Sequence, residues 1–194
     1  MRIVLVLFFV NVLFLGCQRS NAIEREENKL ILEGLFFFNS LEELEEKYGK
    51  SNAQVEFVEA CETCGPEGSP LEESYYITTL FPNSKKEVVI YWNENKSLVK
   101  SISVEKENSE WTTKDGFRIG DKIEKFNGAN LDPFEMIYFY DFIYNVNSNY
   151  SFSFNAELNF YPSEGETFSS KDVRLKGLVL KRIEINLPGT KSNL

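Results

Sequence analysis

The sequence predicts an α+β protein made of two tandem units, each a short capped helix packed on an antiparallel β-meander. Helix-start and helix-end signals recur at a spacing of roughly 80 residues, which is typical of a repeated supersecondary unit. Strand-like runs follow each helix signal. The chain also has 17 Phe and 9 Tyr against 2 Met, which favours sheet interiors over a helical bundle. We expect the units to cover residues 30–107 and 108–187, followed by a tail at 188–194.

The first helix is predicted over residues 40–48. Ser40 and Glu43 form a capping-box pattern, in which side-chain oxygens accept hydrogen bonds from backbone N–H groups at the helix start. Apolar residues then recur at helical spacing, and Gly49 supplies the helix end. One amphipathic helix therefore opens the first unit.

The first sheet is predicted after a long connector. Residues 53–71 carry Cys61, Cys64 and several Gly and Pro residues, a composition typical of a loop. Strand-like runs separated by turn sequences follow and predict an antiparallel meander. These runs cover residues 74–81, 87–92 and 98–104.

The second unit is expected to repeat this order. Asp121 is the predicted N-cap of a helix that ends at Gly128, and Gly116 and Gly120 are expected in turns. Further strands are predicted at residues 135–144, 150–161 and 178–187.

The run 150–160 has the strongest secondary-structure signal. Apolar and polar residues alternate with period two, which places one set in the interior and the other on the outside. The predicted inward set contains Phe152, Phe154 and Leu158, and the outward set contains Ser153, Asn155 and Glu157.

The N-terminus has the pattern of a secretory signal. Arg2 precedes an apolar run, and the sequence Leu-Phe-Leu-Gly-Cys ends that run at Cys17. This pattern resembles the signal of bacterial lipoproteins, which implies removal of residues 1–16 and lipid attachment at Cys17. An ordinary signal peptide or an N-terminal membrane anchor are the alternatives, although the run is shorter than the ~20 apolar residues of a membrane helix.

The predicted location follows from the same segment. Residues 17–29 are polar and without apolar rhythm, as expected for a tether between a lipid anchor and a folded domain. Gln18 at the second mature position resembles lipoproteins sent to the outer membrane. The expected partner is therefore a lipid bilayer, reached through acylated Cys17, with the domain facing the periplasm or the cell surface.

Charge and composition exclude several functions. The formal net charge is −9, which argues against nucleic acid as a partner because phosphate binding needs a basic surface. The chain has no histidine, which excludes Ser-His-Asp and Cys-His catalysis and His-based metal sites. No cofactor or metal site is predicted.

Cys61 and Cys64 form a Cys-x-x-Cys motif. A small structural disulfide outside the cytoplasm is the favoured interpretation. Free thiols and a redox pair are the alternatives, but the Gly-Pro-Glu-Gly that follows is poor helix sequence, whereas a redox pair needs a helix N-terminus.

The clustered carboxylates and the two tryptophans are expected to have structural roles. Clustered glutamates on the first helix are expected to form a solvated face, and the carboxylates near the second aromatic run are expected to accompany core packing, with a groove for a sugar or peptide as the alternative. The tryptophans are expected to pin sheet to helix, with a partner anchor as the alternative. These residues are Glu42, Glu43, Glu45 and Glu46; Asp132, Glu135 and Asp141; and Trp92 and Trp111.

The segment 116–128 (GFRIGDKIEKFNG), with Trp111 before it, resembles a group of uncharacterised bacterial lipoproteins. The tandem helix-then-meander pattern is more distantly similar to the β-lactamase inhibitor protein and the envelope lipoprotein BamE. This resemblance implies a binding or assembly role without an active site. We therefore expect a non-catalytic interaction or envelope-maintenance protein with a protein partner. A small-molecule or glycan binder is the alternative, and a redox protein using Cys61 and Cys64 is less favoured.

Overall fold

The computed structural model describes residues 30–61, 63, 70–71, 73–135, 140–147, 149–156 and 160–187. From Ile31 onward these residues belong to one compact unit. The predicted signal, tether and tail lie outside the described residues. Within the described ranges, no helix is long and apolar enough to cross a bilayer.

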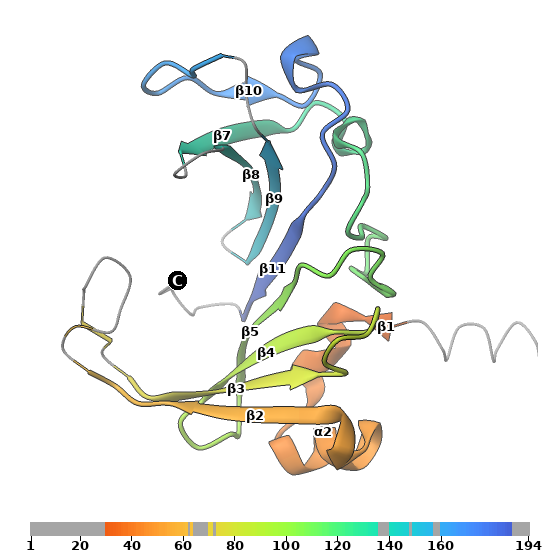
Figure 1. Ribbon diagram of the computed structural model, residues 1–194, viewed down its shortest axis with the longest axis vertical. Helices are drawn as coiled ribbons and strands as arrows, with labels where there is room; N and C mark the ends of the chain where they lie inside the picture. The colour runs from red at the N-terminus through yellow and green to blue at the C-terminus, as the bar shows by residue number, and fades with distance from the viewer. Residues whose placement is uncertain are drawn as a thin grey trace, which may run out of the picture. The chain divides into compact units, whose positions relative to one another are not determined.

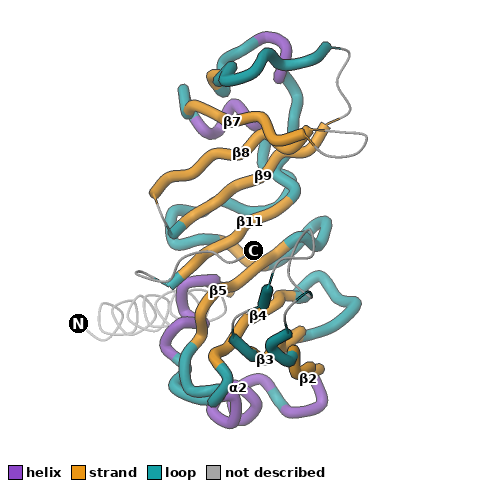
Figure 2. The backbone as a smooth tube through the Cα atoms, turned by 90° about the vertical axis from the view of Figure 1, so that its left-hand side faces the viewer, coloured by secondary structure: helices purple, strands orange, loops and turns teal. Residues whose placement is uncertain are grey.

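A nine-stranded antiparallel sheet dominates the structure (Figure 1). Its strands are β2 (Ala53–Val58), β3 (Tyr75–Leu80), β4 (Val88–Asn93), β5 (Val99–Val104), β7 (Asn130–Glu135), β8 (Tyr140–Asn147), β9 (Tyr150–Ala156), β10 (Phe168–Ser169) and β11 (Arg182–Asn186). Their order across the sheet is β10-β7-β8-β9-β11-β5-β4-β3-β2. Figure 2 shows the succession from β7 to β2 from a second direction.

Strand β11 joins two meanders into one sheet. Strands β2 to β5 follow one another both in sequence and in space, and so do β7 to β9. β11 pairs with β5 on one side and with β9 on the other. Ile183, for example, lies opposite both Val104 and Phe152.

The helical segments are short. α2 (Leu41–Tyr48) is the α-helix of the described chain, and 3-10 turns form the other helical segments. A separate two-stranded sheet pairs β1 with β6. The bounds are β1 (Leu30–Ile31), η1 (Leu32–Phe37), η2 (Lys50–Asn52), β6 (Trp111–Thr112), η4 (Ile123–Phe126) and η5 (Val173–Leu175).

The helix predicted at residues 40–48 is confirmed as α2. Ser40 Oγ accepts a hydrogen bond from the N–H of Glu43 at 3.2 Å, as expected for an N-cap. The Glu43 carboxylate accepts from the N–H of Asn39 at 3.0 Å, one residue further back than in a standard capping box. Gly49 ends the helix at φ +89°, a conformation that favours glycine.

The predicted fold class of two tandem helix-plus-meander units is wrong. The strands form one continuous sheet, and the second predicted helix is the single 3-10 turn η4. Asp121 does not cap it, because its carboxylate accepts from the N–H of Arg118 and pairs with Lys125. Asn127 and Gly128, both at positive φ, end the turn after four residues.

The connector predicted at residues 53–71 is also partly wrong, because its first six residues form β2. Val55 and Phe57 alternate there with Gln54 and Glu56, which is the period-two pattern of a strand. The loop prediction was based on the Gly, Pro and Cys residues that follow, and it did not take this short alternation into account.

One face of the sheet packs against the hydrophobic core. Leu80, Ile90, Ile102 and Ile183 share this inner face, and each is 0% exposed. η1 contacts β5 and lies with α2 beside the β2 to β5 meander (Figure 1). Buried residues of these two segments complete the core on that side: Leu32, Leu35, Leu41 and Leu44.

The alternation of faces predicted in β9 is confirmed for its described residues Phe152, Ser153, Phe154 and Asn155. Phe152 and Phe154 are buried and Asn155 is exposed. Ser153 lies on the outward face, as predicted, but it is buried there because it lies between the larger side chains of Ile143 and Arg182. Leu158 and Glu157 lie outside the described residues.

We expect Phe154→Ala to lower the free energy of unfolding by about 3–5 kcal/mol. Phe154 is fully buried and meets Phe126 edge to face at a centroid distance of 4.8 Å, so its removal leaves a cavity. Asn155→Ala should change stability by less than about 0.5 kcal/mol because the residue is exposed. Urea unfolding of both variants measures the difference, and equal midpoints would contradict the assigned faces.

Candidate functional site

The structure describes one of the three cysteines. Cys17 and Cys64 lie outside the described residues, so the lipidation and the disulfide remain predictions. Cys61 forms an isolated antiparallel bridge with Leu71: its N–H donates to the Leu71 carbonyl at 3.1 Å, and the Leu71 N–H donates back at 2.7 Å. This bridge brings together the two ends of the segment that carries the Cys-x-x-Cys motif.

Both tryptophans are interior residues. Trp92 is 0% exposed and its indole N–H donates to Thr78 Oγ1 at 3.1 Å. Trp111 is 1% exposed, donates to the carbonyl of Lys86 at 2.7 Å and meets the ring of Tyr48 in α2. Neither indole is available to anchor a partner.

The glutamates of α2 act at its N-terminus and on its surface. Hydrogen bonds from the backbone at Glu42 and from Ser40 lower the pKa of the Glu42 carboxyl. Glu43 is held by Asn39, and Glu46 is exposed. These contacts fit a solvated helix face.

The second face of the sheet, opposite the core, carries a buried carboxylate. Asp141 on β8 is 3% exposed, and Arg182 on β11 donates from Nη2 to its Oδ2 at 3.2 Å. Arg182 Nε also lies 3.5 Å from Glu105 Oε1, just beyond the end of β5. Asp141 Oδ1 is buried and has no hydrogen-bond partner among the described residues.

The Asp141 to Arg182 contact depends on a small residue between the two strands. β9 separates β8 from β11, and neighbouring strands lie about 4.8 Å apart. Ser153 on β9 lies directly opposite Arg182, so the long Arg side chain passes over a small one. A larger residue at Ser153 would block this path.

The predicted carboxylates near the aromatic run divide between the two faces. Asp132 and Asp141 lie on the second face, because Asp132 is opposite Ile143, two residues from Asp141 on β8. Glu135 lies on the other face, opposite Tyr140. The structure therefore brings two of the three together.

Exposed Phe134 lies beside Asp141 on the second face. The two residues are directly opposite each other in the β7/β8 pair, and Asp141 is directly opposite Asn155 in the β8/β9 pair. Phe134 is 58% exposed and Asn155 is also exposed. An apolar ring, a buried acceptor and an amide thus form one row across three strands, here called the β7–β9 row.

A pair of tyrosines lies on the same face of the sheet, in the other meander. The rings of Tyr75 and Tyr91 are 6.2 Å apart. Burial, followed by the nearby Tyr75 and Glu184, raises the pKa of Tyr91. Both tyrosines are half-buried, so they close part of this face from solvent.

Glu33 makes a contact that the sequence analysis missed. Its Oε1 accepts from the Tyr150 hydroxyl at 2.9 Å, and its Oε2 accepts from the N–H of Lys114 at 2.8 Å. Burial and the Glu33 carboxylate raise the pKa of Tyr150 well above its usual range. This interaction ties η1 to the start of β9.

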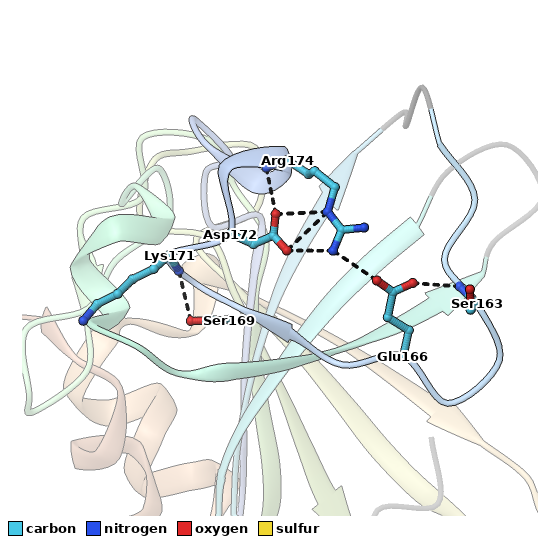
Figure 3. A network of polar contacts seen from close by, with 6 residues as sticks. All are labelled: Ser163, Glu166, Ser169, Lys171, Asp172 and Arg174. Atoms are coloured by element: carbon cyan, nitrogen blue, oxygen red, sulfur yellow. Dashed lines mark hydrogen bonds and ion pairs between the residues drawn. The ribbon is translucent and has the colours of Figure 1, made fainter.

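Arg174 is the centre of a polar network near η5 (Figure 3). Its Nη2 donates to Asp172 at 2.8 Å and to Glu166 at 3.0 Å. Its guanidinium also lies over the rings of Phe160 and Phe168, at 5.0 and 4.6 Å from their centroids. Since Arg174 satisfies both carboxylates, the network stabilises the loop.

β2 is the outer strand of the sheet, and its side chains are exposed. Among the described strands it pairs with β3 alone. Val55 is 38% exposed and Phe57 is 48% exposed, although the Phe57 ring rests on Tyr76 at 4.8 Å. Glu56 between them is also exposed. The other end of the sheet is the two-residue strand β10.

We expect Arg174→Gln to raise the pKa of Asp172 part of the way toward its ordinary value of 3.8, because the guanidinium hydrogen bond is the largest cause of the lowered pKa and the backbone N–H of residue 174 remains. The ionised carboxylate stabilises the fold above pH 3.8, and this contribution is lost as the pH falls through the lowered pKa. An NMR titration of the Asp172 carboxyl measures the change. Lys176→Gln, which removes a positive charge from the same loop, is the control and should leave the titration nearly unchanged.

No group of three or more Cys, Asp or Glu side chains in the described part of the chain could hold a metal ion. Comparison of the chain with known protein families, characterised proteins and solved structures gives no match. The resemblance to envelope lipoproteins therefore remains a prediction.

Proposed function

We propose that this protein is a lipid-anchored envelope protein with a non-catalytic interaction role, and that β2 is the edge at which it binds a protein partner. The observation that carries this proposal is the six-residue edge strand with exposed Val55 and Phe57. An edge strand presents a row of unpaired N–H and C=O groups to a further strand. Main-chain hydrogen bonds then provide affinity, and side chains on both faces provide specificity.

The chemistry of β2 selects the kind of partner. Phe57 and Val55 offer apolar contacts on the inner face, at the margin of the core. Glu56 offers a negative charge on the opposite face. The fitting partner is an extended segment with apolar residues on one face and a basic residue on the other. A second copy of this chain fits poorly, because the net charge is −9 and each copy would bring an exposed Glu56 to the shared edge.

The lipid anchor explains how such an edge would be presented. Acylation of Cys17 would hold the domain at a membrane, with residues 18–29 as the tether. The partner would then be another component of the same envelope, encountered in the plane of the membrane. A non-catalytic role requires none of the His-dependent chemistry that the composition excludes.

The anchor is tested by metabolic labelling with an alkyne analogue of palmitate. Wild-type protein should be labelled, and Cys17→Ala should lose the label because the acylated thiol is gone. Cys61→Ser serves as the control and should keep it. Equal labelling of Cys17→Ala and wild type would overturn the anchor.

The edge is tested by photo-crosslinking in intact cells. Benzoylphenylalanine at Phe57 should give a discrete heteromeric product, whereas the same probe at Phe37, which is 82% exposed on η1, should not. Glu56→Lys in the Phe57 probe background should reduce the yield several-fold by repelling a basic partner. Equal products at the two positions, no effect of Glu56→Lys, or a product at twice the mass of this chain would each overturn the proposal.

A further inference from the structure

Asp141 on the second face has a buried carboxylate oxygen, Oδ1, without a hydrogen-bond partner among the described residues. A buried acceptor without a hydrogen bond costs about 1–3 kcal/mol relative to a satisfied one, and more when the group is charged. Asp141 Oδ1 is in this situation, although Oδ2 of the same carboxylate is held by Arg182. The structure thus fixes the orientation of the carboxylate and leaves one oxygen to accept a donor from elsewhere.

We propose that the β7–β9 row, Phe134, Asp141 and Asn155, binds a pyranose ring of a glycan. The flat Phe134 ring would stack on the apolar face of the sugar, and a sugar hydroxyl would donate to Asp141 Oδ1. The Asn155 amide, which has both donor and acceptor groups, would contact a neighbouring hydroxyl. This binding activity is separate from the partner edge at β2 and does not depend on it.

The spacing of the row suits this ligand. Adjacent strands lie about 4.8 Å apart, so the three side chains project from one face at intervals comparable to the width of one sugar ring. An exposed ring beside a few convergent polar groups is the usual composition of a small-ligand site. Phe134 and Asn155, which lie on either side of Asp141 on β7 and β9, are both exposed to solvent.

The charge balance favours a neutral hydroxyl over a cation. Arg182 already neutralises Asp141, and it also interacts with Glu105. An ammonium group at Oδ1 would approach the Arg182 guanidinium and be repelled by it. A hydroxyl donates a hydrogen bond without adding a charge.

The test uses the full chain in a detergent without sugar headgroups, with cellobiose and maltose as probes. Saturation-transfer NMR and calorimetry should show binding of at least one disaccharide with a Kd of about 1 mM or tighter. Sorbitol, which has hydroxyls but no ring to stack, should bind at least tenfold more weakly. Phe134→Ala and Asn155→Ala are both exposed-site variants and should each weaken binding, Phe134→Ala by tenfold or more.

Phe37→Ala is the matched control, because it removes an exposed Phe that lies on η1, outside both proposed sites. It should bind the disaccharide like wild type. Asp141→Asn, which keeps the size of the side chain but supplies only one oxygen acceptor, should also weaken binding. The glycan site would be overturned if neither disaccharide bound at concentrations up to about 10 mM. It would also be overturned by an unchanged Kd for Phe134→Ala, or by a sorbitol affinity equal to that of the disaccharide. None of these results bears on crosslinking at β2.

Discussion

The pairing of β11 with both β5 and β9 is the constraint on which the sheet depends. β11 contributes five residues, and Ile183 and Ile185 on its inner face are buried between the two meanders. Without this strand, β5 and β9 would each be an open edge beside an incomplete core. The contact is also distant along the chain, because β5 ends at Val104 and β11 begins at Arg182. The loop-closure entropy of this pairing is therefore part of the cost of completing the sheet.

The same strand organises the polar face. Ile183 turns inward, whereas the preceding Arg182 turns outward and links Asp141 of one meander to Glu105 beside the other. The hydrophobic and the electrostatic connections between the meanders therefore come from adjacent residues. Because strand residues alternate between faces, a one-residue slip of β11 would lose both connections at once. The β7–β9 row lies next to this bridge, and its carboxylate is oriented by it.

Local signals in the sequence predicted α2 and the faces of β9 correctly, but they failed at Asp121 and at β2. The Ser40 cap identified α2, and the alternation around Phe154 identified the buried face of β9. The pairing of strands was not predictable in this way, because the alternation of residues within β11 does not indicate that β5 and β9 are its neighbours. The sequence analysis selected Asp141 but not its partner Arg182. The two residues are 41 positions apart in the chain and meet only because β9 places β8 and β11 on either side of it. Pro133 lies inside β7, where it is tolerated because β10 pairs only with the first two residues of that strand.

The two ends of the sheet differ in length, with six residues in β2 and two in β10. Strand-by-strand growth into a fibre requires that each added molecule offer a new edge as good as the one it occupied. A two-residue strand provides too few main-chain hydrogen bonds to serve as that edge. Head-to-tail pairing of β2 in one copy with β10 in the next is therefore disfavoured. A protein crowded at a membrane surface could keep an open edge for recognition without seeding polymers of itself.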